Sequence, residues 1–367
     1  MNENEELIQI MIIFRHGKRN SFINLDTYDI YDTDLIKENT NITIEKGKKF
    51  LSKYFPNKTT QEIFNKNNFK SYISNSIRTI KTFLFRVFDS LPENFKNNFF
   101  DYSQNSLKEF CIKNYNSDFE TKIFSIFEEV NKIANYYTML NKNYFNLYDE
   151  IINEFKKNNK NETLNLFLKY YNDETYEKKN LRYFSLCIIY DFLNYSLDEI
   201  KKNFKKEHFE ILNVFNKLNV NKKIMDIFLS NKIINTIYNY KLFETIKNNL
   251  FKNDNKEFKK LIFFSAHDVF LCSFLHSLNF DIENKNYFFD DEIKLIVFKK
   301  KNNNKYFIKF LYNDEIMKIN FLNNNDNDNN KNIFEVEVEK FVEFLDNNFL
   351  KKYSYDDIID YCNLKRK

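Results

Sequence analysis

Apolar residues form several short, nearly continuous runs along the chain. The run from Leu7 to Phe14 is rich in isoleucine, and the run from Leu261 to Phe264 has the same character. Runs of this kind, without alternating polar positions, are typical of strands buried on both faces of a sheet. A further short strand is predicted from Lys70 to Ser74. The segments Ile293 to Phe298 and Tyr306 to Tyr312, separated by KKKNNNK, are typical of a β-hairpin.

Helical spacing of apolar residues occurs between and beyond these strands. It predicts helices over Thr43 to Tyr54, Ser76 to Phe88, Lys241 to about Phe251, from near Val269 onward, and Val338 to Phe349. An alternation of buried strands and amphipathic helices predicts an α/β fold, with a mixed, mostly parallel sheet flanked by helices.

A long central segment has a different pattern. From about Asn94 to Tyr240 the apolar residues recur almost only at helical spacing, as at Leu147, Ile151 and Phe155. We therefore expect an inserted all-helical cap domain at residues 94–240, within an α/β core made of residues 1–93 and 241–367. The tract NNNDNDNN at residues 323–330 is too polar to pack and is expected to be a loop; we assign it no function.

Length, charge and cysteine content limit the classes of function. A chain of 367 residues exceeds what one core usually serves, which favours a second domain. A net charge of +4 over this length gives no general nucleic-acid surface, so anion binding must be local. The four cysteines are far apart and suggest neither disulfides nor zinc. No secretory signal or membrane-spanning stretch is evident, so we expect an intracellular and cytoplasmic protein without an integral membrane segment.

The segment Arg15-His16-Gly17-Lys18-Arg19 follows directly on the first predicted strand. In open α/β sheets, ligands bind at this edge. A dense positive cluster repels a metal cation but suits a phosphate, whose oxygens accept paired hydrogen bonds from guanidinium groups. The same positive charge disfavours the imidazolium form of His16, leaving it neutral and nucleophilic. Gly17 has no Cβ, which lets the loop bend sharply and come close to an anion.

A second histidine segment, Ser265-Ala266-His267-Asp268, lies between a buried strand and an apolar helix. If the two strands are neighbours, His267 can donate a hydrogen bond to phosphoryl oxygens, and Asp268 can act as a general acid toward the departing oxygen. Arg78 follows a short strand and opens a helix, where free N–H groups add to the attraction for an anion. The other two histidines, His208 and His276, lack such a context, and we assign them no chemistry.

These segments together resemble the histidine acid phosphatase family, the second branch of the histidine phosphatase superfamily. RHGKR is similar to its RHGxR signature, YISNSIRT ending at Thr79 resembles its strand-to-helix segment, and KLIFFSAHDVFLCSFLHSLNF resembles its His-Asp segment. Gly47 and Tyr312-Asn313 also match in position and order. The pair of RHG and AHD motifs is specific, whereas the central helical segment matches only in character.

The resemblance implies a phosphohistidine mechanism that needs neither a cofactor nor a metal. His16 would attack phosphorus, Asp268 would protonate the leaving group, and Arg15, Arg19, Arg78 and His267 would bind the phosphoryl group in transfer. The expected substrate is a small-molecule phosphate ester, an inositol phosphate or a lysophospholipid among the options.

Two departures from the family affect the pocket rather than the reacting groups. Ser21 stands where the family usually has proline, and Ile73-Ser74-Asn75 replaces its Ser-Thr-Asp stretch. The sequence leaves open the physiological substrate, the pH optimum and the oligomeric state. It also leaves two other functions open: a phosphate- or phosphoinositide-binding pseudophosphatase, and a phosphotransferase or mutase.

Overall fold

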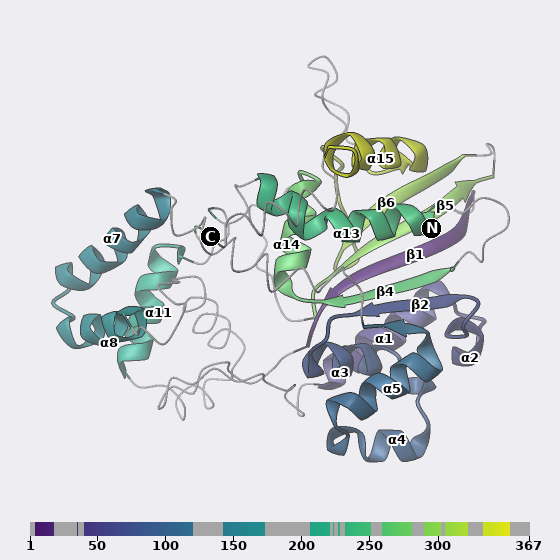
Figure 1. Ribbon diagram of the computed structural model, residues 1–367, viewed down its shortest axis with the longest axis horizontal. Coiled ribbons are helices and arrows are strands. Elements are labelled where there is room, and N and C mark those ends of the chain that lie inside the picture. Colours follow the sequence, from purple (N-terminus) through teal and green to yellow (C-terminus); the bar gives the residue numbers. More distant parts are fainter. Residues whose placement is uncertain are drawn as a thin grey trace. The chain divides into compact units, whose positions relative to one another are not determined.

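The structure, a computed structural model, contains a sheet of eight strands (Figure 1). The structure describes residues 4–17, 35, 40–119, 142–172, 206–220, 223, 227, 232–250, 259–280, 290–301, 305–321 and 333–352. The strands lie in the order β3-β2-β4-β1-β5-β6-β7, and β8 pairs with β6. Their bounds are β1 Glu5–Arg15, β2 Phe69–Ile73, β3 Ser117–Asp118, β4 Leu261–Ala266, β5 Glu292–Lys300, β6 Tyr306–Tyr312, β7 Glu315–Ile316 and β8 Val336–Glu337.

The strand directions confirm the predicted mixed sheet with mostly parallel core strands. β1 is parallel to β4, β4 to β2, and β2 to β3. β5 runs antiparallel to β1, and β6 antiparallel to β5, which confirms the predicted hairpin. The two-residue strands β3, β7 and β8 were not predicted, since so short a segment carries no periodic pattern.

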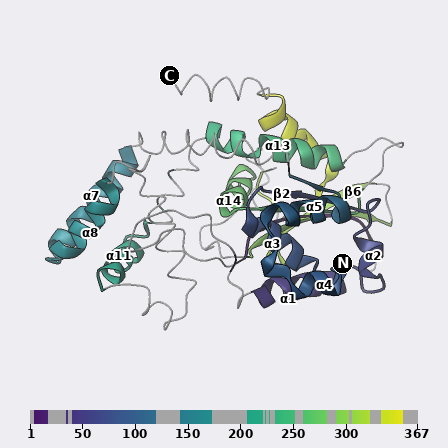
Figure 2. The ribbon, with the colours of Figure 1, turned by 60° about the horizontal axis from the view of Figure 1, so that its bottom comes forward.

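Helices cover both faces of the sheet (Figures 1 and 2). One layer contains α1 (Thr40–Tyr54), α3 (Ile77–Arg86) and α5 (Gln104–Tyr115), and the other contains α13 (Lys232–Leu250), α14 (Asp268–Ser277) and α15 (Val338–Leu345). In β1, the side chains of Ile10, Ile12 and Phe14 pack in the first layer, and those of Met11 and Ile13 in the second. Successive strand residues point to opposite faces. Burial on both faces is therefore the reason for the uninterrupted apolar run in the sequence.

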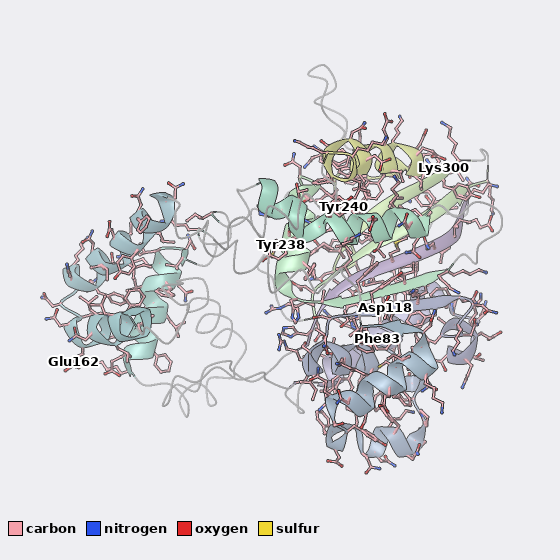
Figure 3. All side chains as sticks on the ribbon, in the orientation of Figure 1. Phe83, Asp118, Glu162, Tyr238, Tyr240 and Lys300 are labelled. Carbon is pink, nitrogen blue, oxygen red and sulfur yellow. The ribbon has the colours of Figure 1, made fainter. Side chains whose placement is uncertain are left out.

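Each helix predicted for this layered part is present, but α13 begins nine residues before the predicted start at Lys241, and the short helix α2 (Thr60–Ile63) was not predicted. The bounds of the helices in this part are α1 Thr40–Tyr54, α2 Thr60–Ile63, α3 Ile77–Arg86, η2 Phe88–Ser90, α4 Glu93–Asn97, η3 Phe99–Asp101, α5 Gln104–Tyr115, α13 Lys232–Leu250, α14 Asp268–Ser277, α15 Val338–Leu345 and η4 Asp346–Leu350. Phe83 of α3, labelled in Figure 3, stacks on Phe69 of β2 at a centroid distance of 6.1 Å and meets Phe263 of β4 at 6.3 Å. These aromatic contacts fix α3 against the strands whose ends bear the histidine and arginine motifs.

The chain divides into two compact units, which are described separately. The first comprises Met1–Lys18, Asp34–Phe127 and Asn235–Lys367, and the second Arg19–Thr33 and Glu128–Ile234. This division differs from the expected core of residues 1–93 and 241–367. Phe95, Leu107 and Tyr115 are buried in the same apolar cluster as β2 and β4, and β3 pairs with β2, so the segment after residue 93 packs on the sheet. That the rest of the segment forms an inserted cap stays a prediction.

The described part of the second unit is helical. It contains α7 Lys142–Lys157, α8 Asn161–Asn172 and α11 Lys206–Lys217. Leu147, Ile151 and Phe155 of α7 are buried together with Phe167 of α8 and Phe215 of α11. These three helices therefore have a small apolar core of their own.

Two of the four cysteines lie in the described residues. Neither Cys111 nor Cys272 is in a disulfide, both are fully buried, and burial raises the pKa of the Cys111 thiol well above its usual value. Cys187 and Cys362, like the polar tract at residues 323–330, lie outside the described residues. Among the helices that the structure describes, none is long and apolar enough to cross a membrane.

Candidate active site

Three neighbouring parallel strands end at the same edge of the sheet, and each is followed by a residue of the predicted site. Arg15 is the last residue of β1 and pairs in register with Ala266 of β4, so that His16 and His267 follow at the same level. Ile73, at the end of β2, pairs with Ser265. Because β4 lies between β2 and β1, the topology places the end of β4 beside two segments that precede it by about 190 and about 250 positions in the sequence.

The ring of His16 is buried and held in one orientation. Only 3% of the residue is exposed, and its Nδ1 lies 2.9 Å from the carbonyl oxygen of Gly17. A carbonyl oxygen only accepts hydrogen bonds, so Nδ1 carries the proton and donates it. In the neutral ring, the lone pair is therefore on Nε2.

The ring of His267 stands beside that of His16. The two ring centroids are 5.4 Å apart, with the planes inclined by 69°. Nε2 of His267 lies 2.9 Å from Oγ of Ser74, the residue that follows β2. Ser74 is itself fixed, because its N–H donates to Ser265 and its carbonyl oxygen accepts a hydrogen bond from Thr79.

The arginines of the predicted site differ in burial and in position. Arg15 is only 2% exposed, and its backbone N–H donates to the carbonyl oxygen of Asp291. Arg78 is partly exposed and lies in the first turn of α3, which begins four residues after Ile73, the last residue of β2. Arg19 lies outside the described residues. Asp268 is the first residue of α14, but its side chain is likewise outside the described part of the chain.

The backbone of the His16 loop is anchored by three separate elements. The N–H of His16 donates to Ala266, its carbonyl oxygen accepts from the N–H of Asp290, and the N–H of Gly17 donates to Oγ1 of Thr82 at 2.8 Å. A Cβ added to Gly17 would lie 3.0 Å from Oγ1 of Thr43 and 3.3 Å from Oδ2 of Asp290. A side chain at position 17 would therefore fit only if these two side chains moved by a few tenths of an ångström. The glycine serves close packing rather than an unusual backbone conformation, because no described glycine has a positive φ angle.

Behind the His16 loop lies a buried ion cluster that the sequence analysis did not identify. It consists of Lys46, Arg86, Asp290, Glu292, Lys294 and Asp314. Arg86 contacts Glu292 at 2.6 Å and Asp290 at 3.8 Å, and Lys294 bridges Glu292 at 2.6 Å and Asp314 at 2.7 Å. Lys46 donates to the carbonyl oxygen of Asp290. The sequence did offer one signal: Lys294 is the only polar residue in the predicted strand from Ile293 to Phe298.

Burial and charge act against each other in this cluster. Burial raises the pKa of the Asp290 carboxyl despite the opposing charges of Arg86 and Lys46. Burial would also raise the pKa of Glu292, but the charges of Arg86 and Lys294 outweigh it and lower that pKa. Burial, together with Arg86, lowers the pKa of Lys46. Paired charges held this tightly anchor the segment that in turn binds the His16 loop.

Asp314, at the edge of the cluster, is more accessible. Burial would raise the pKa of its carboxyl, but hydrogen bonds and charges from Lys294 and from Lys53, 2.9 Å away, lower it to about 2. This carboxylate is therefore ionised at any pH at which the protein is expected to work.

The described residues contain no group of three or more histidine, cysteine, aspartate or glutamate side chains that could hold a metal ion. The chemistry available at the strand ends is that of two adjacent imidazoles with arginine-bearing segments around them. Such an arrangement can place a nitrogen nucleophile against a bound oxyanion.

No protein-family model matches the sequence, and no curated protein sequence matches it. Solved structures do match the fold. The phytase from Citrobacter braakii has a TM-score of 0.56 at 13% identity, over 95% of this chain and 99% of that one. Hafnia alvei phytase in complex with myo-inositol hexakis sulphate also scores 0.56, at 10% identity over 95% and 98% of the two chains.

A multiple inositol polyphosphate phosphatase from Bifidobacterium longum, in complex with phosphate, has a TM-score of 0.51 at 11% identity, covering 87% of this chain and 89% of that one. These similar structures are thus two phytases and a multiple inositol polyphosphate phosphatase. At such low identity, the similarity establishes the fold: this chain has the α/β architecture with a helical domain that the phytases have.

Proposed function

We propose that the protein is a phosphomonoester hydrolase of the histidine acid phosphatase type, with a phosphohistidine intermediate on His16. The observation that carries the proposal is the orientation of His16. Its Nδ1–H is bound by the carbonyl oxygen of Gly17, which leaves Nε2 as the nucleophile, and its ring lies 5.4 Å from that of His267. The phytase fold supports the same conclusion.

The first chemical step would be attack by Nε2 of His16 on phosphorus. A P–N bond forms, and the ester P–O bond opposite to it breaks. We propose that Asp268, at the N-terminus of α14, gives a proton to the departing alkoxide. Arg15, Arg19, Arg78 and His267 would bind the oxygens of the transferring group and stabilise its charge.

The second step would release the phosphate. Asp268, now ionised, accepts a proton from a water molecule, whose oxygen attacks phosphorus as the P–N bond breaks. Inorganic phosphate leaves, and neutral His16 is restored with its Nδ1–H still bound to Gly17. No metal or other cofactor takes part in this proposed cycle.

We propose a small-molecule phosphate ester as the substrate. Two of the structures similar to this chain hold an inositol hexasulphate or phosphate. This favours an inositol phosphate over a lysophospholipid as the first compound to test. A cytoplasmic location stays a prediction from the sequence.

The proposal is tested by comparing the wild type with His16→Ala and Asp268→Asn. Phosphate release is measured with inositol hexakisphosphate, an aryl phosphate and lysophosphatidic acid from acidic to mildly alkaline pH, and the labelled enzyme is trapped by rapid quenching. We expect an acid-labile phosphoenzyme that is absent from His16→Ala. Asp268→Asn should slow the hydrolysis of alkyl esters more than that of aryl esters, because an aryl leaving group needs less protonation.

His276→Ala serves as the matched control. His276 lies in α14, eight positions beyond Asp268, or about 12 Å along the helix axis. It should retain wild-type turnover. A folded wild-type protein that binds phosphate without turning over any of the three esters would instead support a phosphate-binding pseudophosphatase. Transfer of the label to an added alcohol in preference to water would indicate a phosphotransferase.

A further inference from the structure

The peptide bond between His16 and Gly17 is held on both sides. On one side the carbonyl oxygen of His16 accepts a hydrogen bond from the N–H of Asp290, at 3.2 Å. On the other side the N–H of Gly17 donates to Oγ1 of Thr82, at 2.8 Å. Of these two described partners of the peptide, only Thr82 contributes a side chain.

The hydroxyl group of Thr82 both accepts and donates a hydrogen bond. It accepts the hydrogen bond from Gly17 and donates its own proton to the carbonyl oxygen of Arg78, at 2.8 Å. Threonine hydroxyls often bond to the carbonyl four residues earlier in a helix. Here that bond leaves the oxygen lone pairs directed toward Gly17. One fully buried hydroxyl thus joins the residue after the nucleophile to the residue that bears a phosphate-binding arginine.

Side-chain oxygen atoms of three residues lie close to Gly17. The position that a Cβ of Gly17 would occupy is 3.0 Å from Oγ1 of Thr43, 3.3 Å from Oδ2 of Asp290 and 3.6 Å from Oγ1 of Thr82. A buried N–H without a partner is unfavourable, so the backbone at Gly17 would shift if the hydroxyl were removed. The carbonyl oxygen of Gly17 belongs to the next peptide unit and is joined to this N–H through the Cα of Gly17. A shift of that Cα would displace the carbonyl oxygen and, with it, the hydrogen-bond partner of Nδ1 of His16.

We infer that Thr82 is a positioning residue, which sets the orientation of His16 and its placement relative to Arg78 without touching the substrate. The inference rests on the proposed function for its kinetic consequence. The part of the inference that concerns the orientation and tautomer of the His16 ring rests on geometry alone. A nucleophile displaced by about 1 Å from its productive position can lose about 100-fold in rate.

The test uses Thr82→Val, which replaces the hydroxyl with a methyl group, and Thr82→Ser, which keeps the hydroxyl. Thr245→Val makes the same change in α13 and is the control. The rate of phosphoenzyme formation is measured in a single turnover with an aryl phosphate. We expect a loss of about 100-fold in Thr82→Val, a smaller change in KM, and recovery to within about tenfold of the wild type in Thr82→Ser.

Nitrogen NMR of the His16 imidazole gives a readout that needs no turnover. In the wild type and in Thr82→Ser, the proton should be on Nδ1; in Thr82→Val, the ring should show a mixture of tautomers. If Thr82→Val does not fold, Thr82→Ala replaces it in both measurements.

Three outcomes would overturn the inference. They are a wild-type phosphorylation rate in the folded Val or Ala variant, an unchanged Nδ1–H tautomer in that variant, or a Ser variant as impaired as Val. An inactive wild type whose His16 tautomer responds to Thr82 would refute the proposed function and leave the positioning role intact. Inactivity together with an unresponsive tautomer would refute both.

Discussion

Gly47, one of only two glycines in the chain, makes a specific prediction about how α1 packs on α3. A Cβ built on Gly47 would lie 2.3 Å from the carbonyl oxygen of Arg86, whereas Cβ atoms essentially never approach another atom within 3.0 Å. In Gly47→Ala the two helices would therefore have to separate by about 0.7 Å, the difference between these distances. The obstacle is backbone, so no side-chain rotation can relieve it.

Two opposing terms set the magnitude. Overpacking of a dense interior destabilises by about 1 to 3 kcal/mol, and a rigid backbone obstacle favours the upper end. Alanine is a better helix former than glycine by about 1 kcal/mol, which offsets part of this. We therefore expect Gly47→Ala to lower the free energy of unfolding by about 2 kcal/mol. The site should suffer too, because α1 carries Thr43 and α3 carries Arg78 and Thr82.

Urea unfolding followed by circular dichroism measures the change, with Lys49→Ala as the control. Lys49 is exposed on the same helix, and its replacement should alter the free energy by less than about 0.5 kcal/mol. If Gly47→Ala proved as stable as the wild type, or more stable, α1 and α3 would not approach as closely as the structure has them. The steric argument would then be refuted.

Three further predictions concern the residues around the site. Ser74→Ala should lower kcat/KM about tenfold, the equivalent of one lost hydrogen bond to His267, and steady-state kinetics that show no change would exclude a role for this contact. Arg86→Met should destabilise the protein by about 3 kcal/mol in urea unfolding, because it leaves the buried Glu292 with one cationic partner fewer. Adding Glu292→Gln should recover part of this loss. If the effects of the two substitutions on the free energy of unfolding simply added, the ion pair would contribute nothing. The pKa of Asp314 is held at about 2 by its two lysines, below the ordinary value of 3.8, so this carboxylate stabilises the fold above about pH 4 and ceases to do so as the pH falls toward 2. Asp314→Asn should therefore lose less stability than the wild type over that pH interval. An unchanged pH dependence of the free energy of unfolding would count against this role.

The sequence alone predicted the elements whose patterns are local. β1, β4 and the β5–β6 hairpin were identifiable because burial on both faces leaves an uninterrupted apolar run. The positions of His16, His267 and Arg78 just after predicted strands also indicated a common edge of the sheet, since parallel strands direct their ends to one side. The chemistry of the motifs could thus be inferred before the strand order was known.

The tertiary structure decided which distant groups meet. Thr82 and Asp290 anchor the His16 loop from positions 65 or more residues away, and no short pattern marks either of them. The short strand β3 and the packing of α5 beside it depended on contacts with β2, so the boundary expected at residue 93 differed from the observed units. Gly47 stood out by its rarity, but only the closeness of the Arg86 carbonyl gives its reason. Periodicity and motif chemistry are properties of neighbouring residues, so the sequence determines them directly. Hydrogen-bond partners and close backbone contacts depend on how whole elements pack, so they exist only once the chain has folded.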